Sequence, residues 1–182
     1  MRTERWEIDS SHSSVHFAVR HLVIAKVRGT FARWSGTVQA PDGDFSKGTV
    51  AVTIDASSID TGVEQRDSHL KSADFFDVAQ HPELRFVGKR VQARSGSQID
   101  LVGDLTIKGI TREVTLRVEQ HGQAKDPWGN VRAAFTVKTS IDRKDFGLTW
   151  NQVLETGGVM VGDRVDIEAE IEAVKQIEAQ VA

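Results

Sequence analysis

The sequence contains no cysteine, and this absence excludes several kinds of chemistry. Without thiols there can be no disulfide framework, no thiolate metal site and no cysteine nucleophile. The chain also lacks the G-x-S-x-G, phosphate-loop and dinucleotide-binding patterns, and it has no H-E-x-x-H or similar metal-ligand spacing. We therefore predict a protein that is not an enzyme and that needs no cofactor or metal.

Long runs of one charge sign and long apolar runs are also missing. The 182 residues carry a formal net charge of −3, so nothing attracts the chain globally to nucleic acid. No window approaches the ~18 apolar residues of a membrane span. Residues 1–8 run directly into strand-like sequence without an apolar targeting core. If Met1 is the native start, we expect a cytoplasmic protein; a processed N-terminus would indicate a periplasmic or secreted one.

Apolar and polar residues alternate with a period of two through the second half of the chain. This period is typical of strands with one buried face. Four such strands are predicted, with apolar positions at Ile99, Leu101, Gly103, Leu105 and Ile107; Val114, Leu116 and Val118; Val131, Ala133, Phe135 and Val137; and Val165, Ile167, Ala169 and Ile171.

Shorter candidate strands precede these four, at Trp6 to Ile8, Val15 to Val19, Phe31 to Val38, Val50 to Ile54 and Leu84 to Phe86. The total is about eight or nine strands with one clear helix, a set that closes as a barrel or stacks as a sandwich. The length suits one domain, which we place at residues 1–175, followed by a C-terminal tail at 176–182.

The phase of the apolar positions changes within the third candidate strand. Val27, Gly29 and Phe31 have odd numbers, whereas Trp34 and the apolar positions after it have even ones. One extra residue near 32–33 would explain the change, and this predicts a β-bulge that bends the strand. Bulges are common where barrels curve, so we favour an all-β, extended eight-stranded antiparallel barrel with one or two short helices.

A short polar helix is predicted near residue 64. Thr61 and Glu64 have the spacing of a capping box, in which the hydroxyl and the carboxylate each bond the other residue's amide. The helix cannot continue through His81-Pro82, because the residue before proline favours extended geometry. Asp74-Phe-Phe-Asp77 is therefore expected on a turn that leads into the strand around Phe86.

The interior of an eight-stranded barrel is filled by side chains or holds one small or elongated ligand. Several predicted inward positions are small, and they either leave space or compensate for large neighbours such as Phe17, Phe31 and Phe135. These small positions are Gly29, Gly36, Gly103, Ala133 and Ala169.

Several segments in this order resemble the YceI-like family of polyisoprenoid-binding proteins over nearly the whole chain. They are Trp6 to His21, Val27-Arg-Gly-Thr-Phe31 with Trp34-Ser-Gly36, Ser58-Ile-Asp-Thr61, Arg66-Asp-Ser-His-Leu70, Asp74-Phe-Phe-Asp77 with His81-Pro82, Gly103 to Gly109, and Arg143-Lys-Asp-Phe-Gly147. The resemblance implies a lipocalin-like barrel that carries an isoprenoid or similar long lipid and often dimerises. Members commonly carry a secretion signal, from which this sequence departs.

Three histidines cluster in the first strands. Because Val15, Phe17 and Val19 define the inner face of their strand, His12 and His16 are expected to point outward and His21 inward. The three do not converge, which argues against a metal site. His21 could donate to a lipid headgroup at the barrel end, or it could be a core histidine bonded to the backbone.

The segment from Asp142 to Asp163 is an unusually long connection, and such loops are usually functional or disordered. Its residue Arg143 could bind a phosphate or diphosphate headgroup, or it could pair with Asp142 and Asp145. Phe75 and Phe76 could gate the barrel or seal it. Asp74 and Asp77 are interpreted as turn and cap residues rather than an acid/base pair.

The expected function is to carry or sequester a long-chain isoprenoid or another apolar lipid, in a possible homodimer. Two alternatives stay open: an enzyme acting on a bound lipid or quinone with His21 or an aspartate as general base, and a packed barrel that acts as a stress-related interaction protein. The predicted ligand-binding residues are Phe17, Val19, His21, Phe31, Trp34, Phe75, Phe76, Phe86, Phe135, Arg143, Phe146 and Trp150.

Overall fold

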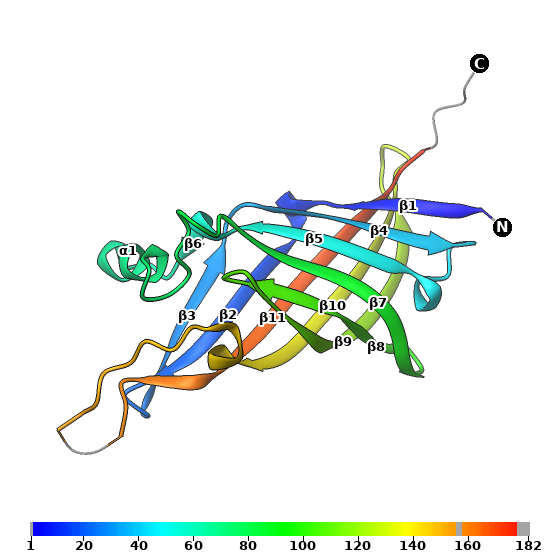
Figure 1. The fold of residues 1–182 in the computed structure, drawn as a ribbon. Helices are drawn as coiled ribbons and strands as arrows, with labels where there is room; N and C mark the ends of the chain where they lie inside the picture. Colours follow the sequence, from blue (N-terminus) through cyan, green and yellow to red (C-terminus); the bar gives the residue numbers. More distant parts are fainter. Residues whose placement is uncertain (1, 156–157, 178–182) are drawn as a thin grey trace.

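The computed structural model describes residues 2–155 and 158–177, and it confirms the predicted all-β antiparallel barrel. Eight strands close the ring in the order β1-β4-β5-β7-β8-β9-β10-β11, and β11 pairs again with β1 (Figure 1). The ring strands are β1 (Thr3–Ile8), β4 (Trp34–Pro41), β5 (Thr49–Asp55), β7 (Glu83–Ser95), β8 (Gln98–Ile107), β9 (Ile110–Lys125), β10 (Val131–Asp142) and β11 (Val161–Lys175).

The period-two alternation of the sequence determines which side chains face the interior. Residues that are paired across antiparallel strands lie on the same face of the sheet. Ile99 pairs with Val118, and Leu101 pairs with Leu116, so their apolar side chains point to the same side of β8 and β9. Residues from the predicted inward face of each of the four long strands line the cavity or lie in the buried clusters, which confirms these faces.

The ring extends into a flap of three further strands, β2 (Ser14–His21), β3 (Ala25–Phe31) and the short β6 (Ile59–Asp60). β11 pairs with β2 along its first half and with β1 at its end. β1 and β2 therefore lie one after the other along the same edge of β11, separated by the 3-10 turn η1 (Ser10–His12). The flap lengthens the barrel beyond the closed ring at one end, as Figure 1 shows.

The predicted β-bulge near residues 32–33 is a complete break between two strands. β3 ends at Phe31 and β4 begins at Trp34. The Ala32 amide donates to the Ser58 carbonyl at 3.1 Å, and the Arg33 carbonyl accepts from the Asp55 amide at 2.9 Å. The predicted change of phase is correct. Its cause is a change of strand partners, since β3 pairs with β2 and β6 whereas β4 pairs with β1 and β5.

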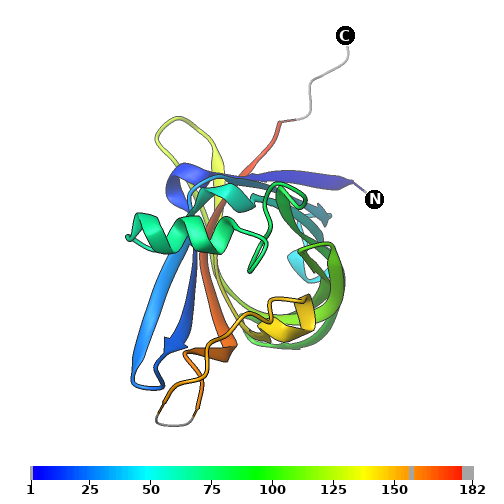
Figure 2. The same ribbon diagram turned by 60° about the vertical axis from the view of Figure 1, so that its left-hand side comes forward.

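A helical segment lies beside the flap, where β3 has no ladder to the ring strands β5 and β7. It comprises η3 (Ala56–Ser58), β6, the helix α1 (Glu64–Lys71) and the turn of residues 72–82. Figures 1 and 2 both show α1 at the end of the barrel where β2 and β3 extend. Part of the wall at this end is therefore built from side chains instead of strand ladders.

The capping box predicted for this helix is wrong. α1 begins at Glu64, and its N-cap, Val63, makes no side-chain capping bond. Thr61 instead donates from both its amide (2.9 Å) and its hydroxyl (2.5 Å) to the Asp67 carboxylate, one turn into the helix. No described helix is long and apolar enough to cross a membrane.

Two apolar clusters fill the ends of the barrel. At the end away from α1, Trp6 is fully buried, its ring lies 5.1 Å from that of Phe45, and Phe45 lies edge-on to Phe135 at 5.0 Å. The cluster at the α1 end contains Phe31, Ala56, Ile59, Phe75, Leu84, Ile107, Phe146 and Leu148. The C-terminal tail predicted at 176–182 lies outside the described residues from 178 onward.

Candidate ligand-binding cavity

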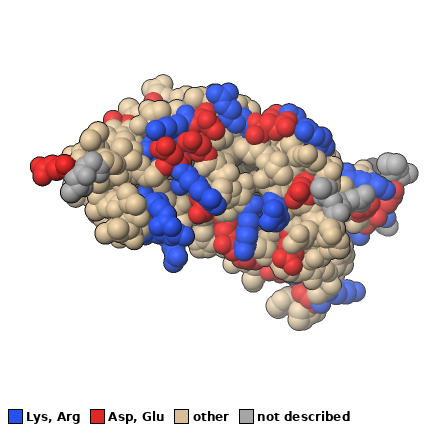
Figure 3. Space-filling model, turned by 90° about the horizontal axis from the view of Figure 1, so that it is seen from below, with Lys and Arg blue, Asp and Glu red and all other residues tan. Residues whose placement is uncertain are grey.

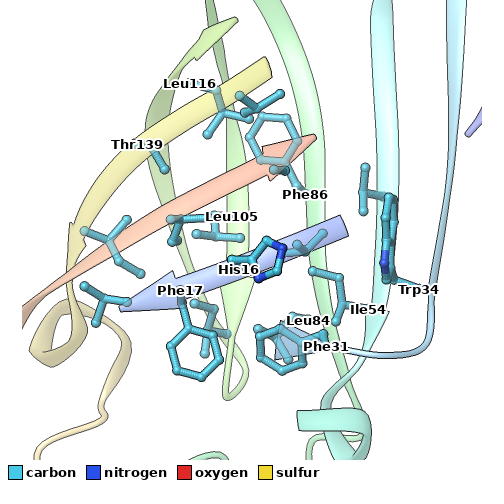
Figure 4. A pocket seen from close by; sticks show the side chains of 18 of the residues that line it. His16, Phe17, Phe31, Trp34, Ile54, Leu84, Phe86, Leu105, Leu116 and Thr139 are labelled. Carbon is cyan, nitrogen blue, oxygen red and sulfur yellow. The ribbon is translucent and has the colours of Figure 1, made fainter. Parts of the chain in front are cut away.

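A cavity of about 700 Å³ runs through the barrel between the two clusters. Aliphatic and aromatic side chains from several strands converge on it in Figure 4, among them Leu105, Leu116 and Ile54. Of the predicted ligand-binding residues, the structure places these in its wall: Phe17, Val19, His21, Phe31, Trp34, Phe75, Phe76, Phe86, Phe135, Arg143 and Trp150.

The small inward residues compensate for large rings at two positions. A Cβ atom at Gly29 would lie 2.3 Å from the ring of Phe17, and one at Gly103 would lie 2.4 Å from the ring of Phe86. Both distances are far below van der Waals contact, so each ring requires a residue without a Cβ atom beside it: Gly29 directly across from Phe17, and Gly103 diagonal to Phe86. The two interpretations of the small residues are thus compatible: glycines accommodate the rings, and the rings still line an open cavity.

Five polar side chains of the cavity wall come from the end of β2 and from α1, and we call this group the polar end: Arg20, His21, Gln65, Arg66 and His69. The His69 side chain is 39% exposed although it lines the cavity, so the cavity meets solvent here. An apolar chain inside the barrel would therefore have its polar group near these side chains.

His69 is oriented by contacts on two sides. Its Nε2 atom lies 2.9 Å from the carboxylate of Asp74, and its ring is perpendicular to the rings of Phe75 and Trp150, with centroids 5.1 and 4.6 Å away. Arg66 is positioned by Thr61, to which it donates from Nε (2.7 Å) and from one terminal nitrogen (2.8 Å). These contacts fix two donor-bearing side chains of α1 at the polar end.

The aromatic pair Phe75-Phe76 forms part of the cavity wall. Phe75 is buried and lies 5.4 Å from Trp150, and Phe76 packs edge-on against Phe31 at 6.0 Å. Asp77, which follows them, has φ +49 and accepts the amides of two later residues, so its predicted turn role is confirmed. Asp74 also lies in the turn, as predicted, and its carboxylate additionally contacts the Nε2 atom of His69.

The histidines of the first strands do not converge. His12 is exposed and contacts the Asp9 carboxylate at 2.8 Å. His16 is exposed on the face of β2 opposite to Phe17, and it also borders the cavity, as Figure 4 shows. His21 lies in the cavity wall, in register with Val161 of β11. Residues 2–155 and 158–177 contain no group of three His, Asp or Glu side chains placed to hold a metal ion.

Arg143 holds the loop that follows β10. Its side chain is 3% exposed, and its guanidinium donates to the carbonyls of Leu148, Trp150, Val161 and Gly162. Burial lowers the pKa of this guanidinium, and the carboxylates of Asp163 and Asp142 partly oppose that shift. Of the two predicted partners, Asp142 interacts with the guanidinium through its charge, whereas the hydrogen bonds of the guanidinium go to backbone carbonyls. Arg143 therefore has a structural role. Backbone carbonyls accept its hydrogen bonds, and the Asp163 carboxylate lies 3.7 Å from its guanidinium.

Phe146 is the predicted ligand-binding residue that lies outside the cavity wall. It is 1% exposed, in the 3-10 turn η4 (Arg143–Phe146), and it packs within the apolar cluster at the α1 end. The long loop after η4 is ordered by Asn151, which bonds both the carbonyl and the amide of Val161. Residues 156–157 of this loop lie outside the described residues.

Sequence reasoning did not identify the α1 residues of the polar end. Gln65, Arg66 and His69 line the cavity, but α1 has no apolar stripe from which an inward face could be inferred. The spacing of 65, 66 and 69 places them on one face of a helix, and this is the signal available in the sequence. Phe45, from the 3-10 turn η2 (Phe45–Lys47), and Met160, from the loop before β11, were also missed.

An eight-stranded antiparallel barrel with an elongated apolar cavity places the molecule in the class of lipocalin-like barrel proteins. Within that class, the chain belongs to the YceI-like family, whose domain pattern matches residues 6–173. Two similar relatives are UPF0312 proteins of Staphylococcus aureus, from strains MSSA476 and USA300. They are 43% and 44% identical over 165 residues, covering 90% of this chain and 94% of theirs.

Solved structures share the fold. BcnA of Burkholderia cenocepacia superposes with a TM-score of 0.79 at 24% identity, covering 91% of this chain and 98% of that one. The Campylobacter jejuni YCEI protein gives 0.74 at 27% identity, with 87% and 90% covered. A polyisoprenoid binding domain from Saccharophagus degradans gives 0.71 at 12% identity, with 94% and 98% covered.

Proposed function

We propose that this protein binds a long-chain isoprenoid or a similar amphiphilic lipid inside the barrel, and that it carries or sequesters that lipid without chemical change. The observation that carries the proposal is the cavity of about 700 Å³ with an almost entirely apolar wall and the polar end formed by β2 and α1. This arrangement matches the two parts of an amphiphile. The fold shared with a polyisoprenoid binding domain supports the same assignment.

The apolar wall can hold such a ligand by its tail. Burying ten hydrocarbon groups contributes a gross ~8 kcal/mol at ~0.8 kcal/mol each. That corresponds to about micromolar binding before the costs of ordering are subtracted. Polar contacts from Arg66, His69 and His21 then mainly determine which headgroups bind with higher affinity. The proposed ligand class is therefore defined by its long apolar chain more than by its head.

Two alternatives are less well supported by the geometry. A packed barrel that acts through its surface requires a filled interior, whereas this interior contains the cavity. Catalysis on a bound lipid would use His21 or an aspartate as general base. Of the aspartates discussed above, Asp74 contacts His69, and Asp77 occupies a turn. Dimer formation and a cytoplasmic location remain predictions from the sequence.

Mass spectrometry of an organic extract of the purified protein tests the proposal directly. We expect a long apolar lipid at near-stoichiometric amounts, with the same mass after prolonged incubation. The delipidated protein should bind a prenyl alcohol and show a change in the fluorescence of Trp34 and Trp150, which line the cavity. Trace lipid together with no response to prenyl compounds would refute carriage, and a change in lipid mass on incubation would favour the enzyme.

A pair of variants on β11 provides the matched control. Ala169 is buried and lines the cavity, whereas Glu168, next to it, is exposed on the outer face. Ala169→Leu should reduce the capacity for long lipids by occupying the cavity, and Glu168→Leu should not. Both proteins should keep their circular dichroism spectrum. Equal lipid capacity in the two variants would show that the ligand lies elsewhere.

A further inference from the structure

A strongly apolar hairpin tip protrudes from the end of the barrel that contains the polar end of the cavity. Between β2 and β3 the chain turns through Leu22, Val23 and Ile24, whose residues are 39%, 67% and 86% exposed. Three consecutive exposed aliphatic residues are unusual on a protein surface, where scattered single ones are the norm. We call these three residues the apolar tip.

The backbone of the apolar tip is strained. Leu22 has φ +54 and Val23 has φ +67, the left-handed conformation. Hairpin turns with this geometry favour Asn, Asp or Gly, and a β-branched residue there is a genuine outlier. Strain of this kind persists in proteins where the residue serves a function that a relaxed residue would not. Leu22 and Val23 therefore place bulky apolar side chains in a backbone conformation that is unfavourable for them.

A second exposed apolar group lies beside the tip. The Leu22 amide donates to the Met160 carbonyl at 2.8 Å, and Val161 pairs with His21, so the tip is adjacent to the loop before β11. In that loop Val153 is 78% exposed, Val159 is 41% exposed, and the two pair with each other. Figures 1 and 2 both show the hairpin and this loop protruding side by side from the same end.

Basic side chains lie behind the apolar tip. Arg20, Lys26 and Arg28 are exposed on β2 and β3, and Arg20 reaches the Val23 carbonyl at 3.5 Å. In Figure 3 much of the left end of the molecule is uncharged, with one acidic side chain at its extreme tip and both basic and acidic side chains further inward. Acidic residues are also near: Asp166 contacts Arg164, and Glu155 is exposed in the loop. An apolar edge backed by cations is the arrangement that suits an anionic membrane surface.

We propose that the apolar tip, together with the exposed side chains of Val153 and Val159, docks onto the surface of an anionic lipid bilayer. In that orientation the aliphatic side chains enter the interfacial layer, and Arg20, Lys26 and Arg28 face the lipid headgroups. The polar end of the cavity then lies at the membrane surface. A long lipid could pass between bilayer and barrel without exposing its whole tail to water, which would cost free energy in proportion to the apolar area.

The shape of the surface favours a bilayer over a protein partner. The tip is a projection of three consecutive aliphatic residues, and the exposed charged residues on β2 and β3 next to it are the cations Arg20, Lys26 and Arg28, although Asp166 on β11 partly offsets the charge of Lys26. A second copy of the chain would bring the same cations together, which is unfavourable. Membrane docking depends on the surface of the protein, so it holds whichever lipid the cavity carries.

Flotation with lipid vesicles tests the proposal. The purified protein should float with vesicles made of equal parts phosphatidylcholine and phosphatidylglycerol, and less with phosphatidylcholine alone. Rising salt should weaken flotation, because the headgroup attraction is screened. The variant Val23→Asn/Ile24→Ser should lower the bound fraction about tenfold or more, since two aliphatic side chains are lost. Asn tolerates the left-handed conformation, so this variant should fold at least as well as the parent protein.

Trp128 provides the control, because it is 83% exposed in the β9–β10 turn at the opposite end of the molecule (Figure 1). Trp128→Ser should float like the parent protein. Uptake of a prenyl alcohol without vesicles should be unchanged in all variants, which separates docking from ligand binding. Docking is refuted if the parent protein stays at the bottom of the gradient or if the tip variant floats equally. A tip variant that instead converts a dimer to a monomer would assign the tip to a second copy.

Discussion

The ring of Phe17 occupies the space that a side chain at residue 29 would need. The two residues pair across β2 and β3, and a Cβ atom at Gly29 would lie 2.3 Å from the Phe17 Cζ atom. Thr61 closes the same site from the segment before α1, because its methyl group would be 3.0 Å from that Cβ. The flap and the helical segment therefore pack against each other at Gly29, where no larger residue fits.

We expect Gly29→Ala to lower the free energy of unfolding by about 1–3 kcal/mol, because the ring and backbone must move apart. Gly162→Ala is the control, since its Cβ would meet Arg20 at an ordinary 3.4 Å. Chemical denaturation of both variants gives the comparison. Adding Phe17→Leu to Gly29→Ala should restore part of the loss, and strictly additive effects would show that the two sites are not coupled.

Arg143→Ala should destabilise the protein by about 3 kcal/mol or more, because four carbonyls lose their donor in a buried site. Arg143→Lys should not restore stability, since an ammonium lacks the planar fork of donors. Affinity for a prenyl phosphate and for the matching prenyl alcohol should fall equally. A selective loss of the phosphate would instead assign Arg143 to the headgroup. Lys144→Ala, at an exposed neighbour, should change stability by less than about 0.5 kcal/mol.

Phe135→Asp should prevent stable folding. The ring is 8% exposed and contacts Phe45 edge-on, so the variant removes a core ring and buries an unpaired charge. We expect a loss of at least about 4 kcal/mol, together with loss of lipid binding. Val87→Asp, at a half-exposed position, is the matched control and should keep the fold. A Phe135→Asp protein with an unchanged melting temperature would contradict the inward orientation of β10.

Acid should weaken the ion-pair cluster around Arg132, which contacts Asp9, Asp126 and Glu172. Desolvation opposes ionisation of Asp126, but hydrogen bonds from Arg132 and Asn130 outweigh it, and its pKa falls from 3.8 to about 2. Hydrogen bonds from Ser11 first, and then from Arg132, also lower the pKa of Asp9. A carboxyl group with a lowered pKa in the folded state stabilises above its unfolded pKa, and this stabilisation is lost as the pH falls through the folded value.

The urea midpoint should therefore decline between about pH 4 and pH 2 as these carboxylates are protonated. Arg132→Gln removes the common partner and should make this decline shallower. Arg112→Gln makes the same charge change at an exposed position and should leave the slope unchanged. Parallel slopes for Arg132→Gln and the parent protein would show that the cluster does not contribute to stability in acid.

The barrel could be predicted from the sequence because its signal is local and repeated. Ile99, Leu101 and Leu105 alternate with polar residues, so only one face of the strand is apolar. That face must point inward, whichever strands lie next to it. The change of phase between Phe31 and Trp34 was also visible. The structural cause of this change could not be predicted, because a β-bulge and a change of strand partners shift the alternation in the same way. The partners are determined by contacts with residues 55 and 58, far along the chain.

The candidate site was predictable where it lies on strands and not where it lies on turns. Phe17 and Phe135 follow the alternation, and both line the cavity. Phe146 lies in a 3-10 turn, where alternation does not apply, and it points into the core instead. His69 was missed as a cavity residue because α1 has no apolar face to orient it.

The segment that replaces a strand ladder between β3 and β7 has a kinetic consequence. η3, β6, α1 and the turn of residues 72–82 line part of the cavity mainly through side-chain contacts. A displacement of α1 would break few backbone hydrogen bonds to the rest of the protein, whereas opening β8 from β9 would break a ten-residue ladder. Local opening of this kind costs much less than global unfolding. We therefore expect the proposed lipid to enter and leave through this side of the barrel faster than the whole protein unfolds.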